Sequence, residues 1–193
     1  MVIGRPRLTG SGVLFVLLGL AILPRPGDSA WAAEPFQDVT DSVGLSGVAG
    51  GKAAWGDCDG NGWVDLLDGS GQVFRNDEGA FTLAANAGAS GILGDFDNDG
   101  LLDVFTYAGK RLYQNVDGMT FVEVTDLLPT LPQTVTRGAL WGDFNSDGYL
   151  DLYIGGYEVW SDPSYPDLML TGSEDGSFTL AWQETGTLMR ARG

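Results

Sequence analysis

The sequence is poor in the residues that most often carry catalysis and positive charge. Its 193 residues include no histidine, one cysteine and ten lysines and arginines, against 26 aspartates and glutamates. The single cysteine, Cys58, excludes an internal disulfide. Without histidine, no imidazole can activate a nucleophile or bind zinc. The formal net charge of −16 excludes nucleic acid and anionic lipid as partners, because both require basic side chains.

Long apolar runs are also missing. The run GVLFVLLGLAIL at residues 12–23 is too short to span a bilayer. Two arginines precede it, and the small-residue site Ala-Trp-Ala at 30–32 follows it. This order is typical of a secretory signal peptide over residues 1–32; an uncleaved membrane anchor is the alternative. We therefore expect a secreted, periplasmic or extracellular protein, no membrane insertion after cleavage, and a mature domain over residues 33–193.

A Gly-Asp-x-Asp/Asn-x-Asp/Asn-Gly-x-x-Asp pattern occurs three times. The copies are WGDCDGNGWVDLL at 55–67, LGDFDNDGLLDVF at 93–105 and WGDFNSDGYLDLY at 141–153, so their first aspartates are 38 and 48 residues apart. Periods of this length indicate stacked supersecondary units. With 30 glycines against 8 prolines, short elements joined by tight turns are expected.

Each unit is expected to hold four strands. One short apolar strand enters the acidic loop, a second leaves it, and a hairpin follows at 72–83, 111–122 and 167–180. The strands that leave the loops are almost continuously apolar, so both of their faces should be covered. Residues 35–45 resemble 120–130, which predicts a further copy of the outermost strand. These features predict an all-β fold, a β-propeller-like stack of four-stranded blades with about three blades present, that is, a partial propeller.

The acidic loops carry oxygen ligands at alternating positions, as calcium sites do. Counting from the first aspartate, positions one, three, five and nine offer side-chain oxygens and position seven a backbone carbonyl, while glycine at position six allows the bend. Three calcium (Ca²⁺) sites are therefore predicted. Their ligands are Asp57, Asp59, Asn61, Trp63 and Asp65; Asp95, Asp97, Asp99, Leu101 and Asp103; and Asp143, Asn145, Asp147, Tyr149 and Asp151.

Solvated acidic turns are the alternative to metal sites, since aspartate, asparagine and glycine are common turn residues. Three matching copies favour metal binding. An EF-hand requires a bidentate glutamate at position twelve and flanking helices, whereas position twelve is Asp68, Thr106 and Ile154 in three strand-like runs. Magnesium prefers a rigid octahedron with retained waters, and zinc prefers histidine or cysteine.

The stretch WGDFNSDGYLDLYIGG at 141–156 and turns such as YQNVDGMTF at 113–121 resemble the FG-GAP or VCBS repeats of integrin-α-like β-propellers, especially those of secreted proteins that also carry an ASPIC/UnbV domain. The resemblance extends over residues 35–193. It implies calcium in each loop, a seven-bladed propeller in complete members, and a role in adhesion or ligand recognition.

Two features depart from the family pattern. Closed propellers need roughly four to eight blades, and three loops supply fewer. The final Arg192-Gly193 pair aligns with residues 137–138, just before the third loop. We therefore expect either missing C-terminal blades or self-association. Residues 156–166 are longer than the matching connections and form either a binding loop or a variable linker.

The sequence contains no Gly-x-Ser-x-Gly or phosphate-binding motif, and its clustered carboxylates are assigned to metal. We therefore expect a secreted, calcium-binding module that is not an enzyme and that serves recognition or adhesion of an unidentified protein or glycan ligand. A propeller enzyme, or the non-catalytic part of a larger secreted enzyme, is the alternative. Trp55, Trp63 and Trp141 are expected to pack in the core, although a ligand site lined by them is the alternative.

Overall fold

The computed structural model describes residues 37–132, 136–156 and 166–183. All of its strands lie in one compact unit, Val39–Gly193, and the other unit, Met1–Asp38, falls outside the described residues except for its last two. The predicted signal peptide, nearly all of the 156–166 insertion and the terminal Arg192-Gly193 pair also lie outside them. In the part of the chain that the structure describes, no helix has the length and apolar character needed to cross a membrane.

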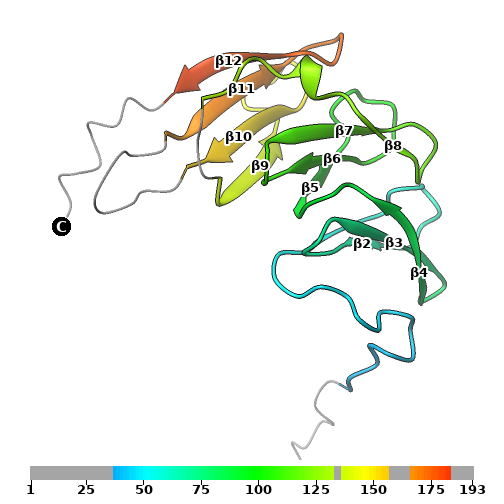
Figure 1. Cartoon of the computed structure of the whole chain (residues 1–193). Helices are drawn as coiled ribbons and strands as arrows, with labels where there is room; N and C mark the ends of the chain where they lie inside the picture. Colours follow the sequence, from blue (N-terminus) through cyan, green and yellow to red (C-terminus); the bar gives the residue numbers. More distant parts are fainter. Residues whose placement is uncertain (1–36, 133–135, 157–165, 184–193) are drawn as a thin grey trace, which may run out of the picture. The chain divides into compact units, whose positions relative to one another are not determined.

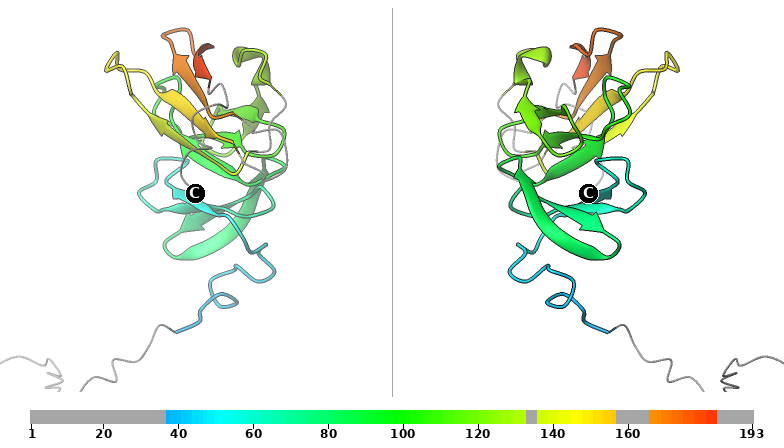
Figure 2. Two further views of the ribbon diagram at one scale, coloured as in Figure 1. Left: turned by 90° about the vertical axis from the view of Figure 1, so that its left-hand side faces the viewer. Right: turned by 90° about the vertical axis from the view of Figure 1, so that its right-hand side faces the viewer.

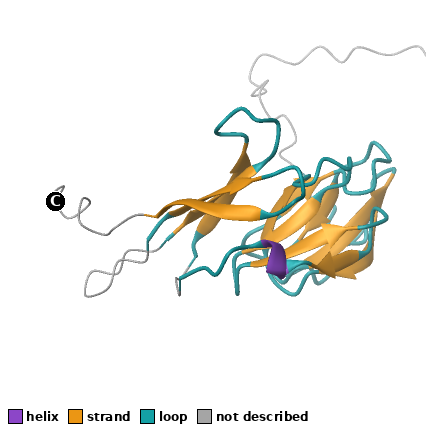
Figure 3. Cartoon of the chain, turned by 90° about the horizontal axis from the view of Figure 1, so that it is seen from above, coloured by secondary structure: helices purple, strands orange, loops and turns teal. Residues whose placement is uncertain are grey.

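The fold consists of three antiparallel four-stranded sheets (Figure 1), in each of which the strands are neighbours in chain order. A 3₁₀ turn, η1 (Thr125–Leu127), is the only helical element among the described residues (Figure 3). The predicted all-β, blade-like architecture is confirmed. The first sheet contains β1 (Ala54–Gly56), β2 (Asp65–Leu67), β3 (Gln72–Asp77) and β4 (Ala80–Asn86); the second contains β5 (Gly91–Gly94), β6 (Asp103–Thr106), β7 (Arg111–Asn115) and β8 (Phe121–Glu123); the third contains β9 (Gly138–Gly142), β10 (Asp151–Gly155), β11 (Leu168–Gly172) and β12 (Phe178–Gln183).

Each sheet repeats the strand order that the sequence predicts. The first strand enters an acidic loop, the second leaves it, and the third and fourth form a hairpin. The β3–β4 hairpin turns at Glu78 and Gly79, whose φ angles of 54° and 92° lie in the left-handed region that two-residue hairpin turns require. Strands β2 and β6 are buried at every residue. The strands that leave the first two loops are thus covered on both faces, as expected.

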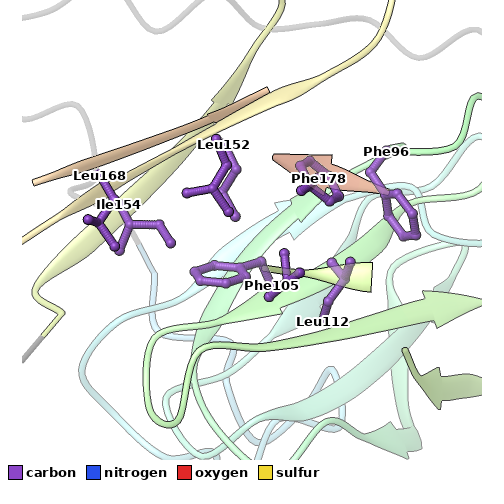
Figure 4. Packing of buried hydrophobic residues seen from close by; sticks show 9 residues of the cluster. Phe96, Phe105, Leu112, Leu152, Ile154, Leu168 and Phe178 are labelled. Carbon is purple, nitrogen blue, oxygen red and sulfur yellow. The ribbon is translucent and has the colours of Figure 1, made fainter. Parts of the chain in front are cut away.

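A large hydrophobic cluster joins the second and third sheets (Figure 4). Phe105 and Leu112 from the second sheet pack with Leu152 and Ile154 from the third, and all four side chains are fully buried. Trp141 packs against this cluster, with its ring centroid 6.3 Å from that of Phe105. Because aliphatic and aromatic side chains from both sheets interlock here, the cluster fixes the two sheets face to face.

A smaller cluster joins the first and second sheets. Leu67 and Val73 from the first sheet pack with Val104 from the second, and Leu93 and Tyr113 cover its edge. The first strands of the three sheets lie next to one another, since β5 contacts both β1 and β9. Figure 2 shows the second sheet between the other two. Consecutive sheets that pack face to face in chain order, with the first strand of each next to that of its neighbour, are the arrangement of propeller blades.

The prediction of an outermost strand at 35–45 is wrong for residues 37–45, the part that the structure describes. Residues 40–44 form turns, and the Val43 carbonyl accepts a single hydrogen bond from the Phe81 N–H of β4, at 2.7 Å. An outermost strand needs the free edge of a blade's third strand, and β3 already pairs with both β2 and β4. The likeness to residues 120–130 therefore reflects the turn after the strand rather than a paired strand.

The close approach of β5 to Trp141 can be tested by adding one carbon atom. A Cβ on Gly94 would lie 2.4 Å from Trp141 Cδ1, whereas a Cβ on Gly138 would meet no atom within 4 Å. We expect Gly94→Ala to lower the free energy of unfolding by about 1–3 kcal/mol through overpacking, and the matched control Gly138→Ala to leave it within about 0.5 kcal/mol. Urea unfolding measures both variants, and equal effects would contradict the tight contact between these sheets.

Candidate metal centres

Each acidic loop joins the first and second strands of its sheet, and neighbouring sheets contact one another's loops. The first aspartate of each loop follows directly on β1, β5 or β9. Asn98 Nδ2 in the second loop donates to the Gly148 carbonyl in the third, at 3.1 Å. Asn115 Nδ2 in β7 donates to the Cys58 carbonyl in the first loop, at 2.9 Å. The three acidic loops therefore follow one another along the same end of the stacked sheets.

The aspartate at position one gives each loop its curl. Its two carboxylate oxygens accept the backbone N–H groups of positions five and six, at 2.8–3.1 Å in all three loops. Position three likewise accepts the N–H of position five, and position five accepts the N–H of position seven. The side chains of alternate positions therefore point into the curled loop.

Two positions in each loop have left-handed backbone. Position six is glycine in every copy, with φ between 89° and 92°. Position four, which is not among the predicted ligands, also has a positive φ: 70° at Gly60, 59° at Asn98 and 62° at Ser146. Glycine and asparagine adopt this region more readily than most residues. The glycine and asparagine at position four of the first two copies are thus the only sign in the sequence that this position needs a left-handed backbone.

Position nine anchors each loop inside the protein. Asp65, Asp103 and Asp151 are 0% exposed. One oxygen of each carboxylate accepts the N–H of position two in its own loop, at 2.8–3.0 Å, and the other accepts an N–H from the third strand of the same sheet, at 2.7–3.0 Å. An amide side chain offers only one oxygen, which explains why position nine is aspartate in all three copies.

Burial changes the ionisation of these anchors. It raises the pKa of Asp103, and the negative charges of Asp97 and Asp99 raise it further. The two backbone N–H groups that donate to Asp103 lower the pKa, but by less, so that it lies at about 7. Burial also raises the pKa of Asp65. A nearby positive charge lowers the pKa of a carboxyl group, so a bound cation would favour the ionised form of both.

In two loops, three carboxylates converge closely enough to share one cation. One ligand oxygen from each lies within 4.8 Å of the others. Oxygens that coordinate calcium lie about 2.3–2.6 Å from the ion, so ligands on opposite sides of it are about 5 Å apart. The donor set contains only oxygen, which fits a hard cation. The converging residues are Asp57, Asp59 and Asp65 in the first loop and Asp95, Asp97 and Asp99 in the second.

The third loop differs from the other two. In the described chain its carboxylates do not form such a group of three. Position three is Asn145, whose Nδ2 donates to Asp147 Oδ2 at 2.8 Å, and residues 143–148 are all exposed. Metal binding stays a prediction for all fifteen residues: the six that converge, and also the side chains of Asn61, Asp103, Asp143, Asn145, Asp147 and Asp151 and the carbonyls of Trp63, Leu101 and Tyr149, which do not belong to these groups.

Residues of the third strand reach position three in the first two sheets, and neither was predicted. Arg75 Nε in β3 lies 2.6 Å from Asp59 Oδ2, although no hydrogen bond forms. Gln114 Nε2 in β7 donates to Asp97 Oδ2 at 2.6 Å. Alignment of QVFRN with RLYQN shows that the two residues are equivalent, but their contact with position three is a property of the fold. The position-three carboxylate of the first loop thus lies beside a positively charged side chain of β3, whereas that of the second loop lies beside a neutral one of β7.

The expectation that three tryptophans pack in the core is wrong for two of them. Trp55 is 56% exposed and Trp63 is 44% exposed. Ala54, which precedes Trp55 in β1, faces the second sheet, so the alternation of side chains along the strand turns Trp55 to the other face. Trp63 lies within the first loop. Trp141 is half-buried against the large cluster, as expected.

The stacked four-stranded sheets and their repeated acidic loops define a β-propeller-like repeat protein. Residues 95–154 match the family model of the FG-GAP-like repeat, from the first aspartate of the second loop to Ile154 in β10. The chain thus contains an FG-GAP-like repeat, and its predicted resemblance to FG-GAP repeat proteins is confirmed. A comparison with curated proteins gives no match. The likeness to ASPIC/UnbV-associated proteins stays a prediction.

The raised pKa of Asp103 predicts an unusual dependence of stability on pH. The folded-state pKa of about 7 exceeds the ordinary value of 3.8, so the folded state binds more protons between these values. The stability gained from this proton is complete below the unfolded-state pKa and is lost as the pH rises through the folded-state pKa. Without divalent cations, we therefore expect the free energy of unfolding to fall between about pH 4 and pH 7.

Urea unfolding at several pH values, in a chelating buffer and in excess calcium, measures this dependence. Calcium should reduce the decrease, because a bound cation favours the ionised carboxyl. A free energy of unfolding that rises steadily with pH in the chelating buffer would contradict the prediction.

The Arg75 guanidinium predicts that the first loop binds cations more weakly than its sequence suggests. We expect Arg75→Gln, which introduces the residue of the second sheet, to tighten binding at the first loop about three- to tenfold, as an ion pair worth roughly 1 kcal/mol implies. Terbium luminescence sensitised by Trp63 reports on this loop, with Trp63→Leu as the control for the source of the emission. The reciprocal change Gln114→Arg should weaken the second loop, and no change in either would refute the charge assignment.

Proposed function

We propose that the protein is an exported, calcium-stabilised recognition module without catalytic activity. The observation that carries this proposal is the convergence of three carboxylates, within 4.8 Å, in each of two loops of a chain that contains an FG-GAP-like repeat. The same hydrogen bonds curl all three loops. The side-chain atoms that point into each loop and could bind a metal ion are oxygens. Calcium prefers such ligands, whereas zinc and copper favour nitrogen and sulfur.

Calcium would add moderately to the stability of the fold. Extracellular modules bind calcium with dissociation constants of about 10⁻⁴–10⁻³ M, so about 1 mM free calcium stabilises one site by about 0.4–1.4 kcal/mol. Three sites would add about 1–4 kcal/mol, compared with a total of roughly 5–15 kcal/mol for an ordinary domain. A stabilising role is therefore sufficient to account for the loops without a role for calcium in chemistry.

The surface near the loops supports recognition of a protein or glycan ligand. Trp63 in the first loop is 44% exposed, and Phe144 in the third is 51% exposed. Large aromatic side chains supply much of the binding energy at interfaces, since they bury a wide area with few rotatable bonds. The net charge of −16 favours a ligand with basic groups, which would be attracted over a distance set by the ionic strength.

Two features of the structure support the absence of catalysis. Burial and the neighbouring carboxylates raise the pKa of the Cys58 thiol to about 12, so the thiolate needed for nucleophilic attack is scarce at neutral pH. A surface hollow of about 330 Å³ beside η1 is lined by one hydroxyl, from Thr125, and one ammonium, from Lys110, together with glycine, proline and leucine residues. This lining offers no carboxylate or imidazole to act as a general base.

Export to the periplasm or the cell exterior belongs to the same proposal. The apolar run at 12–23 and the small-residue site at 30–32 support cleavage by a signal peptidase after residue 32. Loops with affinities in the range of extracellular modules need the millimolar calcium that is found outside the cytoplasm. The low cysteine content is compatible with this location, because stability there can come from packing and metal rather than from disulfides.

Calorimetric titration and thermal unfolding in calcium test the proposed function. We expect millimolar calcium to release or absorb heat and to raise Tm. The second loop has four carboxylates and each of the others three, so Asp97→Ala should reduce the calcium-dependent rise in Tm more than Asn145→Ala. Neither binding heat nor a change in Tm for the wild-type protein would overturn the proposal. Equal reductions in the two variants would overturn only the ranking by charge.

A further inference from the structure

Asn61 is the only asparagine of the sequence that a glycine follows. The backbone nitrogen of the next residue can attack the side-chain amide of an asparagine and close a five-membered succinimide ring, which water then opens. A side chain on that next residue hinders the attack, and glycine has none. Asn61 and Gly62 occupy positions five and six of the first acidic loop, and both are exposed to solvent.

The curl of the first loop brings the two reacting groups together. Asn61 Oδ1 accepts the backbone N–H of Trp63, two residues further on, at 2.7 Å. A side chain that bonds to the backbone two residues on folds back over the intervening peptide, as the first residue of a β-turn does. The side-chain carbonyl of Asn61 is therefore held beside the Gly62 nitrogen, so ring closure requires little further ordering.

Two hydrogen bonds of the loop match the needs of this reaction. The Gly62 N–H donates to Asp57 Oδ2 at 2.8 Å, so a carboxylate lies where the departing proton must go. Asp57 is itself held in place, because its other oxygen accepts the Asn61 N–H at 3.1 Å. The Trp63 N–H donates to Asn61 Oδ1, the atom on which negative charge develops during the attack. A base for the nucleophile and a donor for the developing charge are thus both in place.

We propose that Asn61 is a site of self-deamidation, at which the curled first loop converts its own amide to a carboxylate. The Gly62 nitrogen forms a bond to Asn61 Cγ and gives its proton to Asp57. The Cγ–Nδ2 bond then breaks, the leaving nitrogen takes up that proton through water and departs as ammonia, and Asp57 is again a carboxylate. Water opens the succinimide at either carbonyl and leaves an aspartate or an isoaspartate in place of Asn61. The net reaction consumes water and releases ammonia.

The two products change the first candidate metal centre in different ways. An aspartate at position five gives the first loop carboxylates at positions one, three, five and nine, which is the set that the second loop carries. An isoaspartate inserts a methylene group into the main chain, which displaces the oxygen that accepts the Trp63 N–H. Deamidation thus alters either the charge or the curl of the loop. The reaction itself does not depend on calcium binding.

Asn86 provides a comparison within the same chain. It is also exposed, and its Oδ1 accepts the Gly88 N–H at 2.6 Å in the same kind of turn. Alanine follows it instead of glycine, and the Ala87 N–H donates to the Gly71 carbonyl, at 2.7 Å, instead of to a carboxylate. We therefore expect Asn86 to keep its amide under conditions in which Asn61 loses its own.

Peptide mass spectrometry of the full chain, incubated in a chelating buffer at neutral pH, measures the mass gain that accompanies loss of the amide at each asparagine. We expect Asn61 to react roughly tenfold or more faster in the folded protein than in the same protein unfolded in urea, because the base and the orientation act only in the curled loop. Asn61→Gln, which would need a larger ring, checks the assignment of the signal and should show no mass gain at this position.

Removal of the base gives a second test. Asp57→Asn keeps the size of the side chain but not its charge, so the folded variant should react no faster than the unfolded chain. Asp175→Asn is the matched control, because that carboxylate also accepts a backbone N–H in a turn, from Ser177 at 3.0 Å, but lies in the third sheet. It should leave the rate at Asn61 unchanged. Circular dichroism checks the folding of both variants.

Three results contradict the proposal. The first is an Asn61 that reacts no faster in the folded than in the unfolded wild-type protein, which would show that the loop protects its amide. The second is a folded Asp57→Asn variant that reacts as fast as the wild type, and the third is an Asn86 that reacts as fast as Asn61. The first comparison needs no variant, so it decides the question even if Asp57→Asn fails to fold.

Discussion

The buried carboxylate at position nine is the interaction on which the remainder of each blade depends. It holds an N–H of the acidic loop with one oxygen and an N–H of the third strand with the other, as Asp103 does with Phe96 and Asn115. The loop therefore cannot change shape without loosening the sheet. A buried carboxylate is costly, and the raised pKa of Asp103 expresses that cost. A cation beside it would offset part of the cost, so the fold and the candidate metal site are stabilised together.

The curl of the loops and their charge have separate causes. Backbone N–H groups bound to positions one, three and five produce the same curl in all three copies, whether position three is aspartate or asparagine. The charge at position three depends on another strand, since Arg75 approaches Asp59 and the neutral Gln114 bonds to Asp97. Loops of equal shape can therefore differ in their affinity for a cation. Variation at one strand position would tune each loop without altering the fold.

The sequence predicts the features that depend on local spacing and misses those that depend on neighbours. The period of the acidic motif and the short apolar runs are sufficient to place every strand of the three sheets. Trp55 and Trp141 occupy equivalent positions in the repeat, yet Trp55 is 56% exposed and Trp141 packs against a core cluster, because only Trp141 has a preceding sheet in the described chain. The misplaced strand at 35–45 fails for the same reason, since pairing requires a free edge that the sequence cannot reveal.

The geometry of an acidic loop also depends on the blade that follows it. The turns at Gly118 and Gly176 pack close to Asp59 and Asp97, at position three of the preceding loops, and in those two loops three carboxylates converge. In the third loop, which no described turn supports, the side chains of residues 143–148 are exposed and three carboxylates do not come together. Convergence of the carboxylates in a loop therefore accompanies contact with the hairpin turn of the following sheet.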